Sequence, residues 1–186
     1  MRLVHSCCVA GLIAAALVVL ANPGFAGNDV TGSLPKDPAV AIGTTSGLPV
    51  PRFVSLKSDH VNVRGGPTKD NEVSWIFTRS GLPVEITAEF ENWRRIRDSE
   101  GAEGWVYHSL LSGRRTAVVT TKSRDEFALL HDRADSTSAV AARLESGVVA
   151  NVRKCASSWC RISGNGFDGW IEQERLWGVY PDERVE

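Results

Sequence analysis

The sequence is short of the residues that build reactive and strongly charged sites. It has only four cysteines and four histidines among 186 residues. Its 21 basic and 22 acidic side chains nearly cancel, which leaves a formal net charge of -1. Nucleic-acid-binding domains normally carry a clear basic excess, and proteins held at membrane surfaces carry polybasic clusters. The composition therefore argues against both classes.

Long apolar runs are also scarce, and the one that stands out is close to the N-terminus. Val9–Ala21 is apolar but shorter than a membrane-spanning helix requires. Arg2 precedes it, Pro23 follows it, and small residues lead up to Ala26. This pattern predicts a secretory signal peptide over residues 1–26, cleaved after Ala26. The alternative is a retained membrane anchor. With cleavage, the protein would be periplasmic or secreted.

Cleavage would leave two cysteines, Cys155 and Cys160, in an exported compartment that permits disulfides. The removed segment holds one arginine and no acid, so 20 bases would face 22 acids, a net charge of -2. Residues 27–49 are rich in Gly, Pro, Ser and Thr and show no apolar periodicity. We expect them to form a disordered linker.

The remaining chain contains an internal repeat. "SGLPVEITAEFENWRRI" (80–96) matches "SGVVANVRKCASSWCRI" (146–162), and "GAEGWVYHSLL" (101–111) matches "GNGFDGWIEQERLW" (164–177). The offset is 66 residues before the intervening turn and 65 after it, so one residue is missing from the turn of the second copy. We infer two copies of a module of roughly 60 residues.

Within each copy the apolar residues alternate with polar ones, and Gly-rich turns separate the short segments. This predicts an all-β fold, and the small core predicts a barrel of roughly five to six strands rather than a sandwich. Strict alternation places Ala150 and Val152 on one face of their strand and Cys155 on the other. Trp105 and Trp170 each follow a glycine at a strand start, where we expect them to anchor the two cores.

The ordered motifs resemble the bacterial SH3-like (SH3b) domain family, and more narrowly its exported tandem subgroup in alphaproteobacteria. The first copy has "VNVRGGP" (61–67), "GLPVEI", "NWRRIR", "GAEGWVY" and "SLLSGR", and the second has "WCRI", "GWI" and "LWGV". The resemblance implies two tandem SH3-like β-barrels, at 50–116 and 117–182, and cell-wall peptide or glycan as the class of ligand. The second copy departs from the pattern, because "FALLHDRADSTS" (127–138) replaces the "VNVRGGP" motif, which puts ligand binding by that copy in doubt.

No catalytic or metal-binding pattern emerges. A cell-wall peptidase domain, which exported proteins often join to such modules, needs a Cys or Ser nucleophile with a His base. His60, His108 and His131 accompany no such motif, and we interpret them as surface or loop residues. Two cysteines do not complete a four-ligand zinc site, and their spacing is not that of a thioredoxin-type pair. We predict no enzymatic activity, no cofactor and no metal. An enzyme would need an unrecognised carboxylate pair.

Ligand binding is therefore the favoured function, and its predicted residues lie in the first copy: Arg64, Trp75, Trp93, Arg95 and Tyr107. Aromatic side chains near loops can form a groove, and arginine recognises carboxylates. The alternative is structural: the aromatic residues fill the cores and Arg64 holds loop carbonyls. We predict a non-enzymatic protein that binds peptidoglycan. The runner-up is a structural or adaptor protein that binds another envelope protein.

The two cysteines align with an opposite-charge pair in the first copy. Cys155 matches Glu89 and Cys160 matches Arg94, and each pair flanks a short connection between antiparallel strands. Residues opposite each other on such strands lie close enough for a disulfide. Against a metal half-site, a redox motif and a catalytic thiol, we predict a structural Cys155–Cys160 disulfide.

Overall fold

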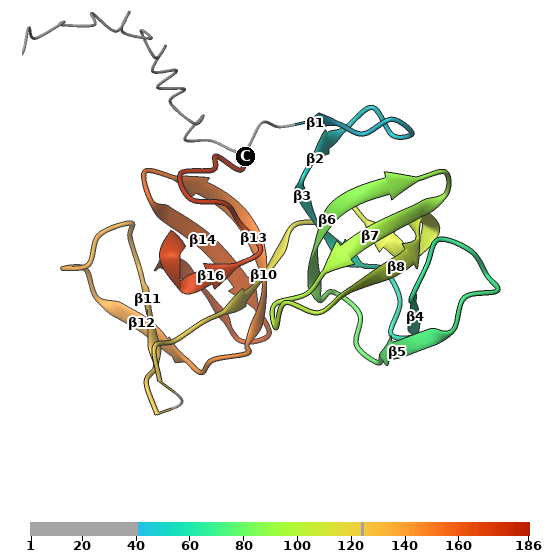
Figure 1. Cartoon of the computed structure of the whole chain (residues 1–186). Helices are drawn as coiled ribbons and strands as arrows, with labels where there is room; N and C mark the ends of the chain where they lie inside the picture. Colours follow the sequence, from blue (N-terminus) through green and yellow to red (C-terminus); the bar gives the residue numbers. More distant parts are fainter. Residues whose placement is uncertain (1–40, 124) are drawn as a thin grey trace, which may run out of the picture. The chain divides into compact units, whose positions relative to one another are not determined.

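The computed structural model describes residues 41–123 and 125–186 (Figure 1). The predicted signal peptide (1–26) and residues 27–40 of the predicted linker lie outside this part of the chain. Two seven-stranded antiparallel sheets, one in each copy, confirm the all-β class with two tandem barrels. Within the described residues, no helix has the length and apolar character needed to cross a membrane.

The first barrel has the strand order β5-β4-β8-β7-β6-β3-β9. Its strands are β3 (Arg52–Leu56), β4 (Val61–Arg64), β5 (Val73–Phe77), β6 (Pro83–Phe90), β7 (Trp93–Arg97), β8 (Glu103–Tyr107) and β9 (Leu111–Ser112). A single turn of 3₁₀ helix, η1 (His108–Leu110), joins the last two strands. The predicted five to six strands become seven because the two-residue strand after this turn is too short to show a period.

The second barrel repeats this order as β12-β11-β15-β14-β13-β10-β16. Its strands are β10 (Thr116–Val119), β11 (Ala128–His131), β12 (Val140–Leu144), β13 (Val149–Ala156), β14 (Trp159–Gly164), β15 (Phe167–Glu172) and β16 (Leu176–Trp177), with η2 (Gln173–Arg175) before the last strand. The strands β6 to β9 match β13 to β16 at the offsets of the sequence repeat, with the missing residue in the β14–β15 turn. The predicted division between 116 and 117 falls within β10.

Each long hairpin contains a bulge that changes which side chains point inward. The register shifts between Ile86 and Ala88 in the first barrel and between Val152 and Lys154 in the second. An extra residue in one strand reverses the alternation beyond it. Cys155 is therefore buried with Val152, whereas strict alternation placed the two on opposite faces.

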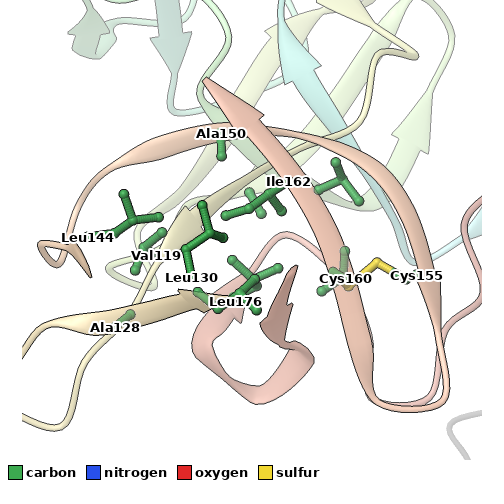
Figure 2. Close-up of a cluster of buried hydrophobic side chains, with 13 residues drawn as sticks. Val119, Ala128, Leu130, Leu144, Ala150, Cys155, Cys160, Ile162 and Leu176 are labelled. Carbon is green, nitrogen blue, oxygen red and sulfur yellow. A yellow bond between two sulfur atoms is a disulfide. The ribbon is translucent and has the colours of Figure 1, made fainter. Parts of the chain in front are cut away.

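Each barrel encloses a separate cluster of small aliphatic side chains. In the first barrel these include Val61, Val63, Ile96 and Val106. In the second, the cysteines Cys155 and Cys160 lie at the edge of the cluster and are joined by the disulfide that crosses between β13 and β14 (Figure 2). The predicted structural disulfide is confirmed.

Trp105 and Trp170 are not the core anchors that the sequence predicted. Their neighbours Val106 and Ile171 point into the cores, so the tryptophans point outward and are only half-buried. The glycine before each tryptophan is explained by the close approach of a neighbouring strand. A Cβ on Gly169 would lie 2.8 Å from the His131 carbonyl oxygen, and one on Gly104 would lie 3.1 Å from that of Arg64. Glycine allows the neighbouring strand to approach closely.

Part of the predicted disordered linker is ordered. β1 (Ala41–Ile42) pairs with β2 (Pro49–Val50) as a hairpin directly before the first barrel. Its turn is held by Glu89 of β6, which accepts hydrogen bonds from the Ser46 hydroxyl (2.6 Å) and the Ser46 backbone N–H (3.0 Å). Composition missed this hairpin because polar contacts with a distant carboxylate hold it, rather than an apolar face of its own.

The described residues belong to one compact unit, and side chains from both sheets meet within it. Phe53 of β3 contacts the rings of Trp177 and Tyr180, with ring centroids 5.1 and 4.7 Å away. The Tyr180 hydroxyl donates a hydrogen bond of 2.8 Å to the buried Glu85 carboxylate, which also pairs with Arg97. Burial and this bond to a carboxylate raise the pKa of Tyr180.

Candidate functional site

Three neighbouring strands of the first barrel, β4, β8 and β7, bring most of the predicted binding residues onto one surface. Arg64 and Arg95 lie opposite Trp105, and Trp93 lies opposite Tyr107. Residues directly opposite each other on antiparallel strands share a face, and the core residues Val63, Ile96 and Val106 occupy the other face. We call Arg64, Trp93, Arg95, Trp105 and Tyr107 the outer face of the first barrel.

The aromatic residues of the outer face differ in how much surface they offer. Trp93 is only 8% exposed, although it is not part of the barrel's core cluster. Its ring meets Tyr107 edge to face, with centroids 5.4 Å apart. Tyr107 and Trp105 are half-buried, so parts of both side chains reach solvent. Trp93 thus supports Tyr107, while Tyr107 and Trp105 form the accessible aromatic surface.

The two arginines of the outer face are differently engaged. The Arg95 guanidinium forms an ion pair of 2.7 Å with Glu103 across the strands, and 49% of its side chain is exposed. Such exposed pairs contribute little stability, so a ligand carboxylate can compete for Arg95. Arg64 instead donates a hydrogen bond of 2.6 Å to the Asn71 carbonyl oxygen in the loop after β4. Arg64 therefore holds a loop carbonyl, as the structural alternative predicted.

Trp75 is the one predicted binding residue that does not join the outer face. It lies opposite the core residue Val63 on β5 and packs against the core cluster. Its ring also contacts Phe77 edge to face. Trp75 therefore packs against the core instead of joining the outer face. Trp105, which the sequence predicted to anchor the core, lies on the outer face.

The second barrel has the same arrangement with altered chemistry. Trp170 lies between Arg161 and His131 as Trp105 lies between Arg95 and Arg64. Arg161 pairs with Asp168 at 2.8 Å, as Arg95 pairs with Glu103. His131 is buried on β11, contrary to the interpretation of all three histidines as surface or loop residues.

His131 also takes over the contact that Arg64 makes in the first barrel. Its Nδ1 lies 3.1 Å from the Ser138 carbonyl oxygen, seven residues along the chain. Arg64 bonds the carbonyl of Asn71, also seven residues along. The replacement of "VNVRGGP" by "FALLHDRADSTS" thus keeps one side-chain bond that holds the loop. The sequence showed the loss of the motif but not this substitution.

A hollow with a volume of about 710 Å³ lies in the second barrel. Trp159, Glu172 and Gln173 line it, together with Ser158, Glu174, Leu176, Val179, Pro181 and Asp182. Trp159 aligns with Trp93 and is half-buried. The sequence did not predict this hollow, because one wall is the chain segment after β16, where the repeat ends.

The remaining candidate residues for catalysis or metal binding do not cluster within the described part of the chain. His60 and His108 are exposed, and the His108 ring lies beside Tyr107 with centroids 5.1 Å apart. In residues 41–123 and 125–186, no group of three or more His, Cys, Asp or Glu side chains is arranged to hold a metal ion.

Comparison with known families now identifies the two barrels. The model of the bacterial SH3 domain matches residues 57–113 and 124–178, which together make up more than half of the chain. The chain belongs to the bacterial SH3 domain family. Both tandem copies are covered, in agreement with the resemblance seen in the sequence.

More distant comparisons add little to this assignment. A comparison with curated proteins gave no match. Two solved structures from Trichomonas vaginalis are similar over part of the chain, NlpC2 and NlpC1, each with a TM-score of 0.32. They share 11% and 12% sequence identity over 68% and 76% of this chain. The match covers 48% and 51% of those two chains, about half of their length.

Proposed function

We propose that this protein is a non-enzymatic, exported binding protein that recognises cell-wall peptide or glycan through the outer face of the first barrel. The observation that carries the proposal is the cross-strand cluster of Arg95, Trp105 and Tyr107. Its members point away from the core although two of them are large and aromatic. Partly exposed aromatic rings beside an arginine suit a flat sugar or a peptide that carries a carboxylate.

The geometry of the outer face suggests how such a ligand is held. Trp105 and Tyr107 are two residues apart on β8, so their side chains rise from the same face and present one apolar strip. Arg95 lies across from Trp105 and can turn from Glu103 to a ligand carboxylate at small cost. Arg64 borders the strip and orders the loop beside it.

The test is retention of the purified protein on insoluble peptidoglycan. Tyr107→Ala and Arg95→Gln remove an accessible aromatic ring and the exposed charge without touching the core. We expect each variant to lose most of its retention. Arg161→Gln is the matched control, because it breaks the equivalent ion pair in the second barrel. Retention of the original protein no higher than that of an unrelated exported protein would overturn the cell-wall proposal.

An adaptor function is the second candidate, and the edge strands favour it. β5 and β12 each end their sheets and expose apolar side chains, namely Val73 and Ile76 on β5 and Val140 on β12. Unpaired edges of this kind can accept a strand from another protein. Crosslinking in the periplasm followed by mass spectrometry separates the candidates, since one dominant protein partner would favour the adaptor.

A further inference from the structure

We propose that the hollow of the second barrel binds a short peptide segment through a lysine or arginine side chain. This site is separate from the outer face of the first barrel, and it gives the second copy a binding function of its own. Its volume of about 710 Å³ lies within the usual range of ligand pockets.

The charge of the lining selects a cation. Glu172, Glu174 and Asp182 line the hollow, and no basic residue does. The acids come from two walls, since the glutamates lie at the junction of β15 and η2 and Asp182 lies in the segment after β16. Arg175 reaches Glu172 only at 3.7 Å, and its Nη1 lies 2.8 Å from Glu126 instead. Glu172 is thus only loosely paired, while Glu174 and Asp182 are exposed and form no ion pair within the described residues, so the hollow can attract an incoming positive charge.

The apolar part of the lining suits the rest of such a side chain. Trp159 lies directly opposite Glu172, so an ammonium or guanidinium group held by the carboxylate also lies close to the indole. Leu176, Val179 and Pro181 supply apolar contacts for the methylene stem of a long basic side chain. Neither feature would be needed to hold a small inorganic cation.

Both walls of the hollow are fixed to the strand that carries the disulfide. Cys155 exchanges two backbone hydrogen bonds with Val185, of 2.8 and 3.2 Å, and these attach the C-terminal segment to β13. The disulfide to Cys160 holds the strand that begins with Trp159. A rigid site spares a ligand the entropic cost of ordering it.

A third contact fixes the walls to each other. The buried Gln173 side chain donates hydrogen bonds to the carbonyls of Tyr180 (2.8 Å) and Glu183 (3.0 Å). Its backbone N–H donates to the Ser158 carbonyl in the β13–β14 turn at 2.8 Å. Gln173 therefore ties both sides of the hollow to η2.

The first barrel does not carry an equivalent site, although it has the same fold. At the repeat offset of 65 residues, Glu172 and Glu174 correspond to Tyr107 and Ser109. Val179, which lines the hollow, corresponds to the basic Arg114. The two copies therefore differ in charge at this point, which is why a basic ligand would choose the second.

The experiment measures binding of an acetylated and amidated peptide of alternating alanine and lysine to the purified protein. Calorimetry gives the affinity, and the indole N–H resonance of Trp159 gives the location. The same peptide with its lysines acetylated is the control ligand. We expect the lysine peptide to bind and to shift the Trp159 resonance, and its affinity to fall as the ionic strength rises. The acetylated peptide, which lacks the positive charges, should bind far more weakly.

Matched variants decide whether the hollow is responsible. Glu174→Gln combined with Asp182→Asn should weaken binding about tenfold, and neither change removes a core contact. Glu145→Gln, an exposed acid of the same barrel outside the hollow, should leave binding unchanged. Arg95→Gln, which tests the outer face of the first barrel, should also have no effect here. Equal binding of the two peptides, no binding of either, or an unchanged affinity in the double variant would overturn the proposal.

Discussion

Glu89 and Arg94 face each other across the β6–β7 hairpin at the positions that Cys155 and Cys160 occupy in the β13–β14 hairpin. The Glu89 Oε1 lies 3.4 Å from the Arg94 Nε, and both side chains are almost completely buried. One copy thus has an ion pair where the other has a covalent bond, at the same register and after the same bulge. Glu89 makes further contacts that a disulfide cannot, because it also holds the β1–β2 hairpin and pairs with Arg52 at 2.8 Å.

Removing the disulfide should destabilise the second barrel selectively. Replacing Cys155 and Cys160 together by alanine should lower the free energy of unfolding by about 2 kcal/mol, because only a short loop is closed. Hydrogen exchange followed by mass spectrometry measures where protection is lost, and we expect the loss in residues 149–177. The first barrel, which has no disulfide, is the internal control. Free thiols in protein isolated without a reductant would contradict the structural role.

Glu89 should make the β1–β2 hairpin sensitive to acid. Burial by itself raises the pKa of Glu89, but hydrogen bonds from Ser46 and Arg52 and the charge of Arg94 outweigh it and lower the pKa to about 2. Because the pKa in the folded state lies below the ordinary value of 4.5, the stabilisation is complete above that value. It is lost as the pH falls from 4.5 towards 2, and amounts to about 3 kcal/mol.

The Ser46 amide reports this titration directly, because its N–H donates to the Glu89 carboxylate. Its proton chemical shift should change with a midpoint near pH 2 rather than near 4.5. In Glu89→Gln the acid titration should disappear, and the hairpin should be loosened at all pH values because Arg52 and Arg94 lose their partner. A midpoint near the ordinary value would show that the carboxylate is not held as described.

The repeat explains why much of the fold could be predicted. The matching segments fixed the register between copies, so that the position of the disulfide followed from the alignment of Cys155 with Glu89. The alternation of apolar and polar residues did not reveal the bulges, since they depend on how the hairpins coil around the core. The β1–β2 hairpin was missed for a related reason, because the carboxylate that holds it is more than forty residues away.

The binding residues were harder to predict, because tryptophan serves equally well in a core and on a surface. For this reason Trp75, which was predicted to bind ligand, packs against the core, and Trp105, which was predicted to anchor the core, lies on the outer face. The strand alternation around Trp105 contained the missing information. Val106 is the apolar neighbour that fills the core, so Trp105 must face outward. The hollow of the second barrel had no signal of this kind, because Asp182 and Pro181 lie beyond the last repeated segment.

The exchange of roles between Trp75 and Trp105 can be measured. Trp75→Ala should lower the free energy of unfolding by about 3 kcal/mol, because the ring packs against the core cluster. Trp105→Ala should cost only about 1 kcal/mol, because this side chain lies outside that cluster, although both tryptophans are half-buried. Urea denaturation provides both values, and peptidoglycan retention provides the contrast: Trp105→Ala should lose binding while it remains folded. Equal destabilisation by both changes would contradict the assignment.

Arg64 and His131 should each order the loop that follows their strand. Arg64→Ala removes the bond to the Asn71 carbonyl, and we expect a loss of about 1 kcal/mol together with faster hydrogen exchange in residues 65–72. His131→Ala should affect residues 132–138 in the same way, and more strongly, because His131 is buried and also contacts the Trp159 ring edge to face.

Arg64→Lys distinguishes the ordering of the loop from the effect of the side-chain charge. Lysine retains the charge but not the planar guanidinium, so restored peptidoglycan retention without restored loop protection would mean that Arg64 contacts the ligand itself. Retention that follows loop protection in both variants would mean that Arg64 acts by holding the loop.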